Sequence, residues 1–497
     1  MMKLILASLF LIPVLGGTVI YLLKGSVKTS TRILALCAFL YLGAALKAFF
    51  HPGSGNVLIP SYLELDSHGE LFLLITGVLF TFCSCHILSW LPAEEAALQK
   101  EGDDSNALMK SHTFCALLCG FLFSMTLVIF SRNFGMLWVA IESTTILSAP
   151  LILYHRSVSS LEAMWKYLLI CSVGIALALF GTMLFALASS VSDPLHRSAT
   201  LSFDELYFLR GKFDPGLLKG AFIFILAGYG TKMGLAPFHT WLPDAHSEAP
   251  GPVSALLSGA LLNCSFLGIL RFLQVMPEKL MPFCNNFLLV FGFLSLGTAA
   301  CFLIRQNDFK RMLAYSSVEH MGILAILLAV SPELSSPLWK LHAAGHSLLK
   351  MSLFLIAGNL LIATGTRHIP SLGGLSRPLK KNCVLWVTGL LMICGMPPSP
   401  LFFTEFLMLF QLKLPLAALA LFLLFAVFAG MSYNMLSMVM GQSREVQITG
   451  EAASSAEKLW KTPLLALTLA VAGGITLLYI LLDQLPCYST FFKTWEM

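Results

Sequence analysis

Long apolar runs separated by short polar connections dominate this sequence. A helix needs about 20 apolar residues to cross roughly 30 Å of bilayer hydrocarbon. Fourteen runs reach or approach this length: 4–23, 32–50, 70–90, 112–131, 134–154, 162–190, 216–237, 252–275, 286–304, 311–330, 340–364, 383–408, 413–440 and 462–483. The pattern predicts an all-α polytopic membrane protein with about 14 transmembrane helices.

Composition and charge support this interpretation. The chain has 497 residues, of which 57% are hydrophobic and 11% are charged, whereas about 25% of residues are charged in soluble domains. The first run begins like a signal peptide but continues to Leu23 without a small-x-small cleavage site, so we expect it to be the first span. The net charge of +5 therefore indicates membrane orientation, not nucleic-acid binding.

Orientation follows from the distribution of Lys and Arg. With the N-terminus outside, the inner loops and adjoining helix ends carry 16 of these residues and the outer segments carry 11. Because positive residues accumulate on the inner side of a membrane, we expect the N-terminus outside. An even number of spans then places the C-terminus outside as well.

Ionisable residues lie within several of the predicted spans. A charged side chain at the bilayer centre costs about 2.5–3.5 kcal/mol on insertion scales, so each needs a reason. The set comprises Glu142, Lys166, Lys232, Glu319, His320, His346, Lys350 and Glu405. One alternative is that each charge pairs across helices and only stabilises the bundle. The recurrence of carboxylate, amine and imidazole groups in at least five spans favours a path for protons.

Two of these charges accompany predicted helix breaks. Glycines and Pro237 surround Lys232 within 228–237, and Gly395 with three prolines precedes Glu405 within 395–405. Paired interrupted spans are typical of inverted-repeat transporters. Burial disfavours the charged amine of a lysine and a nearby carboxylate favours it, so such a lysine can load and unload a proton.

The breaks predict a division of the chain into four parts. Residues 1–111 form an N-terminal three-helix segment, 112–275 and 286–440 form two inverted five-helix repeats, and 441–497 form a C-terminal segment. The seventh and twelfth helices are the broken ones. In this scheme Glu142 corresponds to the pair Glu319 and His320, Lys166 to Lys350, and Lys232 to Glu405.

Two other groups of residues have the chemistry of metal ligands. Cys83, Cys85 and His86, with Cys115 and Cys119, lie inside apolar runs and lack metal-site spacing, which favours packing. The second group is His239, Asp244, His246 and Glu248. Its prolines predict an extended loop, which we interpret as an inner-side segment that controls proton uptake or contacts a neighbouring subunit. The sequence therefore predicts no metal site.

Three segments resemble the antiporter-like subunits of respiratory complex I, the Mrp-type cation/proton antiporters and the membrane subunits of energy-converting hydrogenases. They are KMGLAPFHTWLPDAHSEAPGPVSALLSG (232–259), DFKRMLAYSSVEHMG (308–322) and PPSPLFFTEF (397–406). SSVEHMG together with SPLFFTEF is most similar to the hydrogenase-4 and formate hydrogenlyase branch. The resemblance implies fourteen helices and a polar axis along the membrane midplane.

The resemblance also implies roles for individual residues. Glu142 and Lys166 would form a modulating carboxylate–lysine pair, and Lys232 would be the central proton carrier. The rest of the axis would comprise His320, His346, Lys350 and the terminal Glu405, with Glu319, Asn263 and His239 as accessory residues. Asn263 stands where relatives often carry a lysine or histidine. Because asparagine holds no transferable proton, water would have to connect Lys232 to His320.

The function implied is that of a proton-translocating membrane subunit of a redox-driven complex in a bacterial or archaeal cytoplasmic membrane. The sequence has no redox centre and no cofactor motif, so we expect no cofactor, and partner membrane subunits with a peripheral redox arm would handle the electrons. One alternative is a subunit of a Mrp-type antiporter that moves sodium as well as protons without a redox partner. The other is a non-pumping membrane anchor. No nucleic-acid partner is expected.

Overall fold

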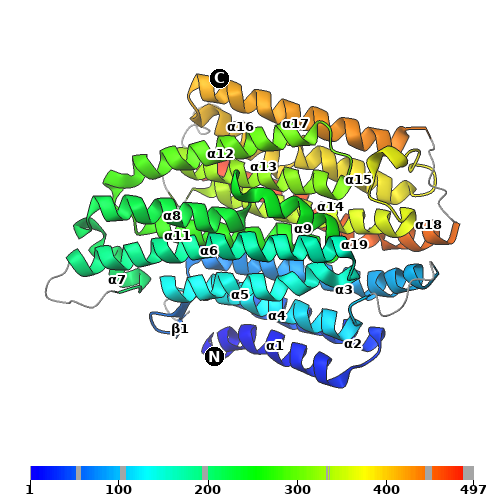
Figure 1. The fold of residues 1–497 in the computed structure, drawn as a ribbon, viewed down its shortest axis with the longest axis horizontal. Coiled ribbons are helices and arrows are strands. Elements are labelled where there is room, and N and C mark those ends of the chain that lie inside the picture. The colour runs from blue at the N-terminus through cyan, green and yellow to red at the C-terminus, as the bar shows by residue number, and fades with distance from the viewer. Residues whose placement is uncertain are drawn as a thin grey trace.

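The computed structural model describes residues 2–51, 57–100, 108–192, 200–331, 334, 336–442 and 450–484. Most of the long helices run roughly parallel to one another and form a bundle, with β1 and α7 at one end and α18 at the other (Figure 1). Within the described ranges, twelve helices are long and apolar enough to span a membrane. The chain is therefore an α-helical polytopic membrane protein, as predicted.

The N-terminal part contains three long helices and a small hairpin. Its elements are α1 (Met2–Leu23), α2 (Val27–Phe49), β1 (Val57–Ile59), β2 (Leu63–Glu64) and α3 (Ser67–Lys100). The two short strands pair antiparallel, with Val57 opposite Glu64. The hairpin lies in the connection between α2 and α3, outside the membrane spans.

The next part of the chain contains the first interrupted helix. Its helices are α4 (Ser111–Phe130), α5 (Phe134–Ile152), η1 (Leu153–His155), α6 (Val158–Ser192), α7 (Phe203–Leu209), η2 (Arg210–Lys212), α8 (Pro215–Met233), η3 (Phe238–Thr240), α9 (Trp241–Glu248), α10 (Gly251–Leu256), the π-helical turn η4 (Leu257–Leu261) and α11 (Leu262–Gln274). Together α10, η4 and α11 form one span, and its most apolar window is completely buried. This span therefore lies at the centre of the bundle.

The remaining part contains the second interrupted helix. Its helices are η5 (Glu278–Leu280), α12 (Met281–Leu303), α13 (Phe309–Val330), α14 (Pro337–Thr364), η6 (Ile369–Ser371), α15 (Lys380–Ile393), α16 (Pro400–Gln411), α17 (Leu414–Met440), α18 (Gly450–Glu457), η7 (Lys458–Trp460) and α19 (Lys461–Gln484). The twelve long spans match the first eleven predicted runs and run 413–440. Run 383–408 corresponds to α15 and α16, and run 462–483 to α19. The described helices are thus compatible with fourteen crossings.

Both predicted helix breaks are present, and a glycine with a positive φ marks each of them. Gly234 follows α8 with φ +83°, and Gly395 follows α15 with φ +70°. Only glycine adopts this left-handed conformation without steric penalty. The interruptions of the seventh and twelfth helices are therefore encoded by the backbone at these two positions.

The segment after the first break differs from the sequence prediction. Residues 238–248 form η3 and α9, so the expected extended loop is wrong. Pro243 lies in the first turn of α9, where a missing backbone N–H breaks no intrahelical hydrogen bond. The short helix carries Asp244 and Glu248 on the same face, one turn apart.

Equivalent backbone contacts occur at two places in the chain. The N–H of Phe134 donates to the carbonyl of Leu201, and the N–H of Phe309 donates to the carbonyl of Arg367. Two further equivalent bonds run from Phe203 to Arg132 and from Ile369 to Asn307. Matching Phe134 with Phe309 relates α5 to α13 by an offset of 175 residues. These contacts are compatible with the predicted repeats.

Helices α6 and α8 pack unusually closely. A Cβ atom added to Gly228 of α8 would lie 2.5 Å from the carbonyl oxygen of Gly174 in α6. Small residues at such contacts allow two helix backbones to approach each other. This contact between the two backbones therefore fixes the position of α6 relative to α8. It also sets the distance between the side chains that the two helices direct toward each other.

Candidate functional site

Lys232 lies in the last turn of α8 and its side chain is completely buried. Its Nζ donates a 2.8 Å hydrogen bond to Thr145 Oγ1 and a 2.5 Å bond to the phenolic oxygen of Tyr167. That phenolic oxygen also lies 2.6 Å from Ser148 Oγ. The amine is thus held by hydroxyl groups from α5 and α6, and within the described part of the chain no carboxylate contacts it directly.

Glu142 reaches Lys232 through one of these hydroxyl groups. Thr145 Oγ1 donates a 3.2 Å hydrogen bond to Glu142 Oε2 while it accepts the bond from Lys232. The other carboxylate oxygen accepts a 3.0 Å bond from Ser172, whose side chain is exposed at the surface of the chain. We name Glu142, Thr145, Ser148, Tyr167, Ser172 and Lys232 the Lys232 cluster. It extends from the lateral surface of the chain to its buried interior.

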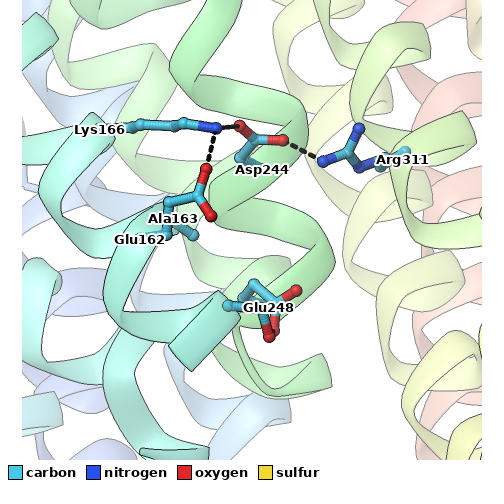
Figure 2. Close-up of a pocket in the computed structure, with 7 residues that line it drawn as sticks. Glu162, Ala163, Lys166, Asp244, Glu248 and Arg311 are labelled. Atoms are coloured by element: carbon cyan, nitrogen blue, oxygen red, sulfur yellow. Dashed lines mark hydrogen bonds and ion pairs between the residues drawn. The ribbon is translucent and has the colours of Figure 1, made fainter. Parts of the chain in front are cut away.

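The structure separates Lys166 from Glu142, so the predicted pair of these two residues is wrong. The Nζ of Lys166 lies 2.6 Å from Glu162 and 3.1 Å from Asp244, and 46% of the side chain is exposed (Figure 2). Successive residues on a helix point about 100° apart. Tyr167, the next residue, faces Lys232 instead. The physical reason is the rotation of α6 about its axis, which apolar runs leave undetermined.

Lys166 belongs to a network of charged side chains that we name the surface ion network. Asp244 pairs on its other side with Arg311 of α13 (Figure 2). Arg367 pairs with Glu248 and lies 3.4 Å from Asp308. The residues around Lys166 line a small pocket of about 70 Å³. The network therefore connects α6 and α9 with α13 and with the segment after α14.

The four polar residues around α9 do not converge on one point. The ring of His246 is fully buried and stacks on Phe354 at a centroid distance of 4.8 Å. The ring of His239 lies 6.1 Å from that of Tyr315. Asp244 and Glu248 are engaged in the surface ion network. The four side chains therefore make separate contacts, two with aromatic rings and two within the surface ion network.

A second polar group lies where α13, α14 and α16 meet. His320 Nδ1 lies 3.2 Å from His342 Nε2 and 4.0 Å from Glu405 Oε1. The rings of His320 and His346 have centroids 5.2 Å apart. We name His320, His342, His346 and Glu405 the histidine cluster. Its three histidines are fully buried, and Glu405 is 8% exposed.

Thr404 determines which nitrogen of His342 carries the hydrogen. Its Oγ1 donates its one hydrogen to the carbonyl of Leu401 at 2.9 Å, so toward His342 Nδ1, at 2.8 Å, it acts as an acceptor. A neutral imidazole carries hydrogen on one nitrogen only. His342 Nε2 therefore presents its lone pair to His320.

Lys350 and Glu319 lie close to the histidine cluster. The buried Nζ of Lys350 donates hydrogen bonds of 2.7 Å to the carbonyl of Leu313 and 2.8 Å to Ser316 Oγ. Glu319 is 3% exposed and lies one residue before His320 on α13. Both residues are thus buried in the second half of the chain, as the sequence suggested.

Asn263 lies on α11, which packs against α8. Its side-chain amide donates to Ser347 Oγ at 2.7 Å and to the carbonyl of Gly259 at 2.8 Å. Ser347 follows His346 on α14, and Gly259 belongs to the π-helical turn η4. Such turns are frequent at functional sites. Asn263 therefore connects α11, which packs on α8, to the residue next to His346 of the histidine cluster.

Sequence reasoning missed five residues of the two clusters. Thr145 lies three residues after Glu142, Ser148 three residues after Thr145, and His342 four residues before His346, so helical spacing places each beside its neighbour on one helix face. Tyr167 and Ser172 had no comparable signal. The offset of 175 residues relates Thr145 to His320 and Glu142 to Ser317. Glu142 and the pair Glu319 and His320 thus lie on matching helices, within three residues of equivalent positions.

The predicted correspondence between Lys232 and Glu405 relates the two interrupted helices, not equivalent positions within them. Lys232 lies two residues before its break glycine, Gly234, whereas Glu405 lies ten residues after Gly395. The two residues are on opposite sides of the breaks. Matching the break glycines relates Glu405 to Asp244, so the two interrupted helices carry their charges in different halves.

The fold and its buried ionisable groups define a polytopic membrane protein with two interrupted helices and two buried polar clusters. The family described as NADH:quinone oxidoreductase/Mrp antiporter, TM matches residues 131–432, which is more than half of the chain. The chain belongs to this family. The resemblance inferred from the three sequence segments is confirmed.

Individual relatives agree with this assignment. A hydrogenase-4 component F homolog of Methylacidiphilum infernorum is 41% identical over 296 residues, which are 58% of this chain and 60% of the relative. This likeness confirms the predicted relationship to the hydrogenase-4 branch. The chain spans between 39% and 60% of the length of the curated relatives compared with it.

Solved structures share the fold over nearly the whole chain. A chain of a membrane-bound sulfane sulfur reductase, an archaeal respiratory membrane complex, has a TM-score of 0.79 at 21% identity and covers 95% of this chain and 94% of its own. A chain of the Mrp complex from a Dietzia species has a TM-score of 0.79 at 16% identity, with 95% and 96% covered. Because they cover 95% of the chain, these likenesses extend beyond residues 131–432, the region matched by the family.

Proposed function

We propose that this chain is a proton-translocating membrane subunit of a redox-driven respiratory complex of the energy-converting hydrogenase or NADH:quinone oxidoreductase type. The observation that carries the proposal is the buried amine of Lys232, connected to the carboxylate of Glu142 through the hydroxyl of Thr145. A buried ionisable group within a span is costly and is usually functional. The likeness to a hydrogenase-4 component supports the redox-driven class.

Lys232 holds or releases its proton according to the state of Glu142. When Glu142 is charged, Thr145 transmits its attraction and the ammonium form is favoured. When Glu142 is neutralised, burial favours the neutral amine, and the proton leaves toward Asn263 and the histidine cluster. Because Asn263 carries no transferable proton, water completes this part of the path.

The histidine cluster carries the proton onward to Glu405. His320 and His342 exchange a hydrogen across their 3.2 Å contact, and His346 and Lys350 lie beside them. Glu405 is the terminal group because it is the least buried member of the cluster. Glu319, Asn263 and His239 act as accessory polar groups.

Both ends of this polar axis approach a lateral surface of the bundle. Glu142 is bonded to the exposed Ser172, and the exposed Phe406 follows Glu405 on α16. Neighbouring membrane subunits at these two surfaces would place further ionisable groups against both ends. We assign the electrons to a peripheral redox arm carried by those partners, and we assign no cofactor to this chain.

The location proposed is a bacterial or archaeal cytoplasmic membrane with both termini outside. In this orientation the surface ion network faces inward, because it lies where α6 and α13 begin and α9 ends. Its carboxylates would then concentrate protons on the uptake side. The basic residues Lys166, Arg311 and Arg367 of the same network would reduce this effect, because their ion pairs neutralise part of the negative charge.

A second candidate is a subunit of a cation/proton antiporter without a redox partner. The observation that favours it is the likeness to the Mrp complex, with the same TM-score as the reductase complex. A non-pumping anchor would keep the fold but would have no use for the Lys232 cluster. The two active candidates differ in what drives proton movement.

The decisive experiment is purification of the native complex, identification of its subunits by mass spectrometry, and measurement of proton movement in sealed vesicles. The proposal expects redox subunits in the complex and proton movement only with an electron donor. Sodium-for-proton exchange without a donor, in a complex that contains only membrane subunits, would establish the antiporter instead. Electron transfer with no proton movement would indicate the anchor.

A further inference from the structure

The histidine cluster also places three possible metal ligands close together, an arrangement that proton transfer does not require. Among the described residues, His320, His342 and Glu405 bring one ligand atom each to within 4.8 Å of the others. Two imidazole nitrogens and one carboxylate oxygen are a common ligand set for Zn²⁺ and related divalent ions. The three side chains come from three different helices, α13, α14 and α16.

The distances between the ligand atoms suit a tetrahedral ion. Ligand atoms at about 2.0–2.1 Å from Zn²⁺ are about 3.3 Å from each other in a tetrahedral site. His320 Nδ1 and His342 Nε2 are 3.2 Å apart. Glu405 Oε1 is 4.0 Å from His320 Nδ1 and has no hydrogen-bond partner in the structure. A rotation of the Glu405 side chain that brings this oxygen closer to the two nitrogens would complete the set.

The neighbouring residues orient His342 as a metal ligand. Thr404 accepts the hydrogen of His342 Nδ1 and is itself tied to the carbonyl of Leu401. Metal-bound histidines usually donate their second ring N–H in this way, which fixes the tautomer and the ring orientation. The Nε2 lone pair of His342 therefore points toward His320 before any ion arrives.

We propose that His320 Nδ1, His342 Nε2 and Glu405 form a binding site for a divalent transition-metal ion such as Zn²⁺, with water as the fourth ligand. The ion would lie between His320 Nδ1 and His342 Nε2, the two atoms that exchange a hydrogen in the proposed function. Binding therefore inhibits proton translocation. The inhibition rests on the proposed function, whereas the binding site itself does not.

Cobalt is a suitable probe because tetrahedral Co²⁺ with imidazole ligands absorbs visible light. The purified full chain, or the complex that contains it, is titrated with Co²⁺, and Zn²⁺ is then added. We expect one Co²⁺ per chain with a tetrahedral spectrum, displaced by Zn²⁺. His342→Gln removes a ligand and should abolish the spectrum. The matched control is His86→Gln, which changes a buried histidine on α3 outside the cluster.

A second variant keeps all three ligands. Thr404→Val removes the group that orients His342 and should weaken Co²⁺ binding by about 10–100-fold. This measurement decides the question if His342→Gln does not assemble. Equal Co²⁺ spectra in the parent, Thr404→Val and His342→Gln proteins would overturn the site, as would the absence of any binding.

Proton movement is measured separately on the same preparations. We expect Zn²⁺ to suppress it in the parent and the His86→Gln control, and at about 10–100-fold higher concentration in Thr404→Val. Equal sensitivity of the parent and Thr404→Val would overturn the inhibitory role. If metal-free complexes move no protons, the proposed function fails, and the Co²⁺ spectra still decide whether the metal site exists.

Discussion

The phenolic oxygen of Tyr167 accepts a 2.5 Å hydrogen bond from the buried Nζ of Lys232. The ring of Tyr167 also packs against Trp241 at a centroid distance of 4.9 Å. Tyr167→Phe would keep this packing and remove one of two hydroxyl partners of the amine. Since a hydrogen bond to a charged group contributes about 1.5–3 kcal/mol, we expect an assembled complex whose proton translocation falls by roughly tenfold or more. Vesicle assays of protons moved per electron pair test this; parent-like pumping would make Tyr167 a packing residue.

Lys232 itself can be tested with two substitutions. Lys232→Met retains the length of the side chain and removes the proton, whereas Lys232→Arg retains a charge that is not released. We expect both complexes to assemble and to transfer electrons while proton translocation through this chain is lost. Lys219→Met, on the exposed face of the same helix, is the control and should behave like the parent. If Lys232→Arg pumps normally, Lys232 is a fixed charge.

Glu142→Gln tests the connection between the carboxylate and the amine. The amide oxygen still accepts the hydrogen bond from Thr145, but the negative charge is gone. Lys232 then loses the attraction that favours its charged form. We expect normal assembly and a loss of coupled transport, measured as protons moved per electron pair. Full pumping in the assembled variant would show that Glu142 only stabilises the bundle.

Gly395→Ala tests the geometry of the second break. Gly395 has φ +70°, and an added Cβ would overlap Glu405 Oε2. A left-handed conformation costs a residue with a Cβ about 1–2 kcal/mol, and Glu405 must move away. We expect a lower thermal stability and reduced proton translocation. Gly297→Ala, where a Cβ meets open space, should change neither; equal behaviour of the two variants would exclude this role for Gly395.

Asp66 gives the fold a dependence on acid. Burial tends to raise the pKa of Asp66, but Arg271, Arg132 and the Gly69 N–H together hold this pKa below its usual value. The stabilisation is therefore complete above the unfolded-state pKa of about 3.9 and is lost as the pH falls through the lower folded-state value. Asp66→Asn should cost about 3–5 kcal/mol at neutral pH, as expected when one partner of a buried pair is removed.

Thermal unfolding of the parent and Asp66→Asn between pH 3 and pH 7 checks this, because the difference should shrink only below about pH 4. Asp204→Asn is the control: Asp204 also pairs with Arg132, but its side chain is 59% exposed, so its removal should have little effect. A difference between parent and Asp66→Asn that does not change with pH would contradict the electrostatic origin.

The spans and both breaks could be predicted from sequence because apolar run length and the Gly–Pro pattern report directly on backbone structure. The partner of Lys166 could not, because it depends on the rotation of α6, and residues 166 and 167 both lie in an apolar run. His342 was missed although its spacing of four residues from His346 is a helical signal. Asp244 was placed in a loop because the prolines around it were interpreted as extended, whereas Pro243 lies in the first turn of the helix α9.

Lys166 and Tyr167 are consecutive residues of α6 that contact different surroundings: the first joins the surface ion network and the second holds the buried amine of Lys232. This turn of α6 therefore connects the aqueous surface of the chain directly to the buried amine. A displacement of this turn changes both contacts at once. Salt in the aqueous phase screens exposed ion pairs. A change in ionic strength would therefore also alter the hydrogen bond between Tyr167 and the buried amine of Lys232.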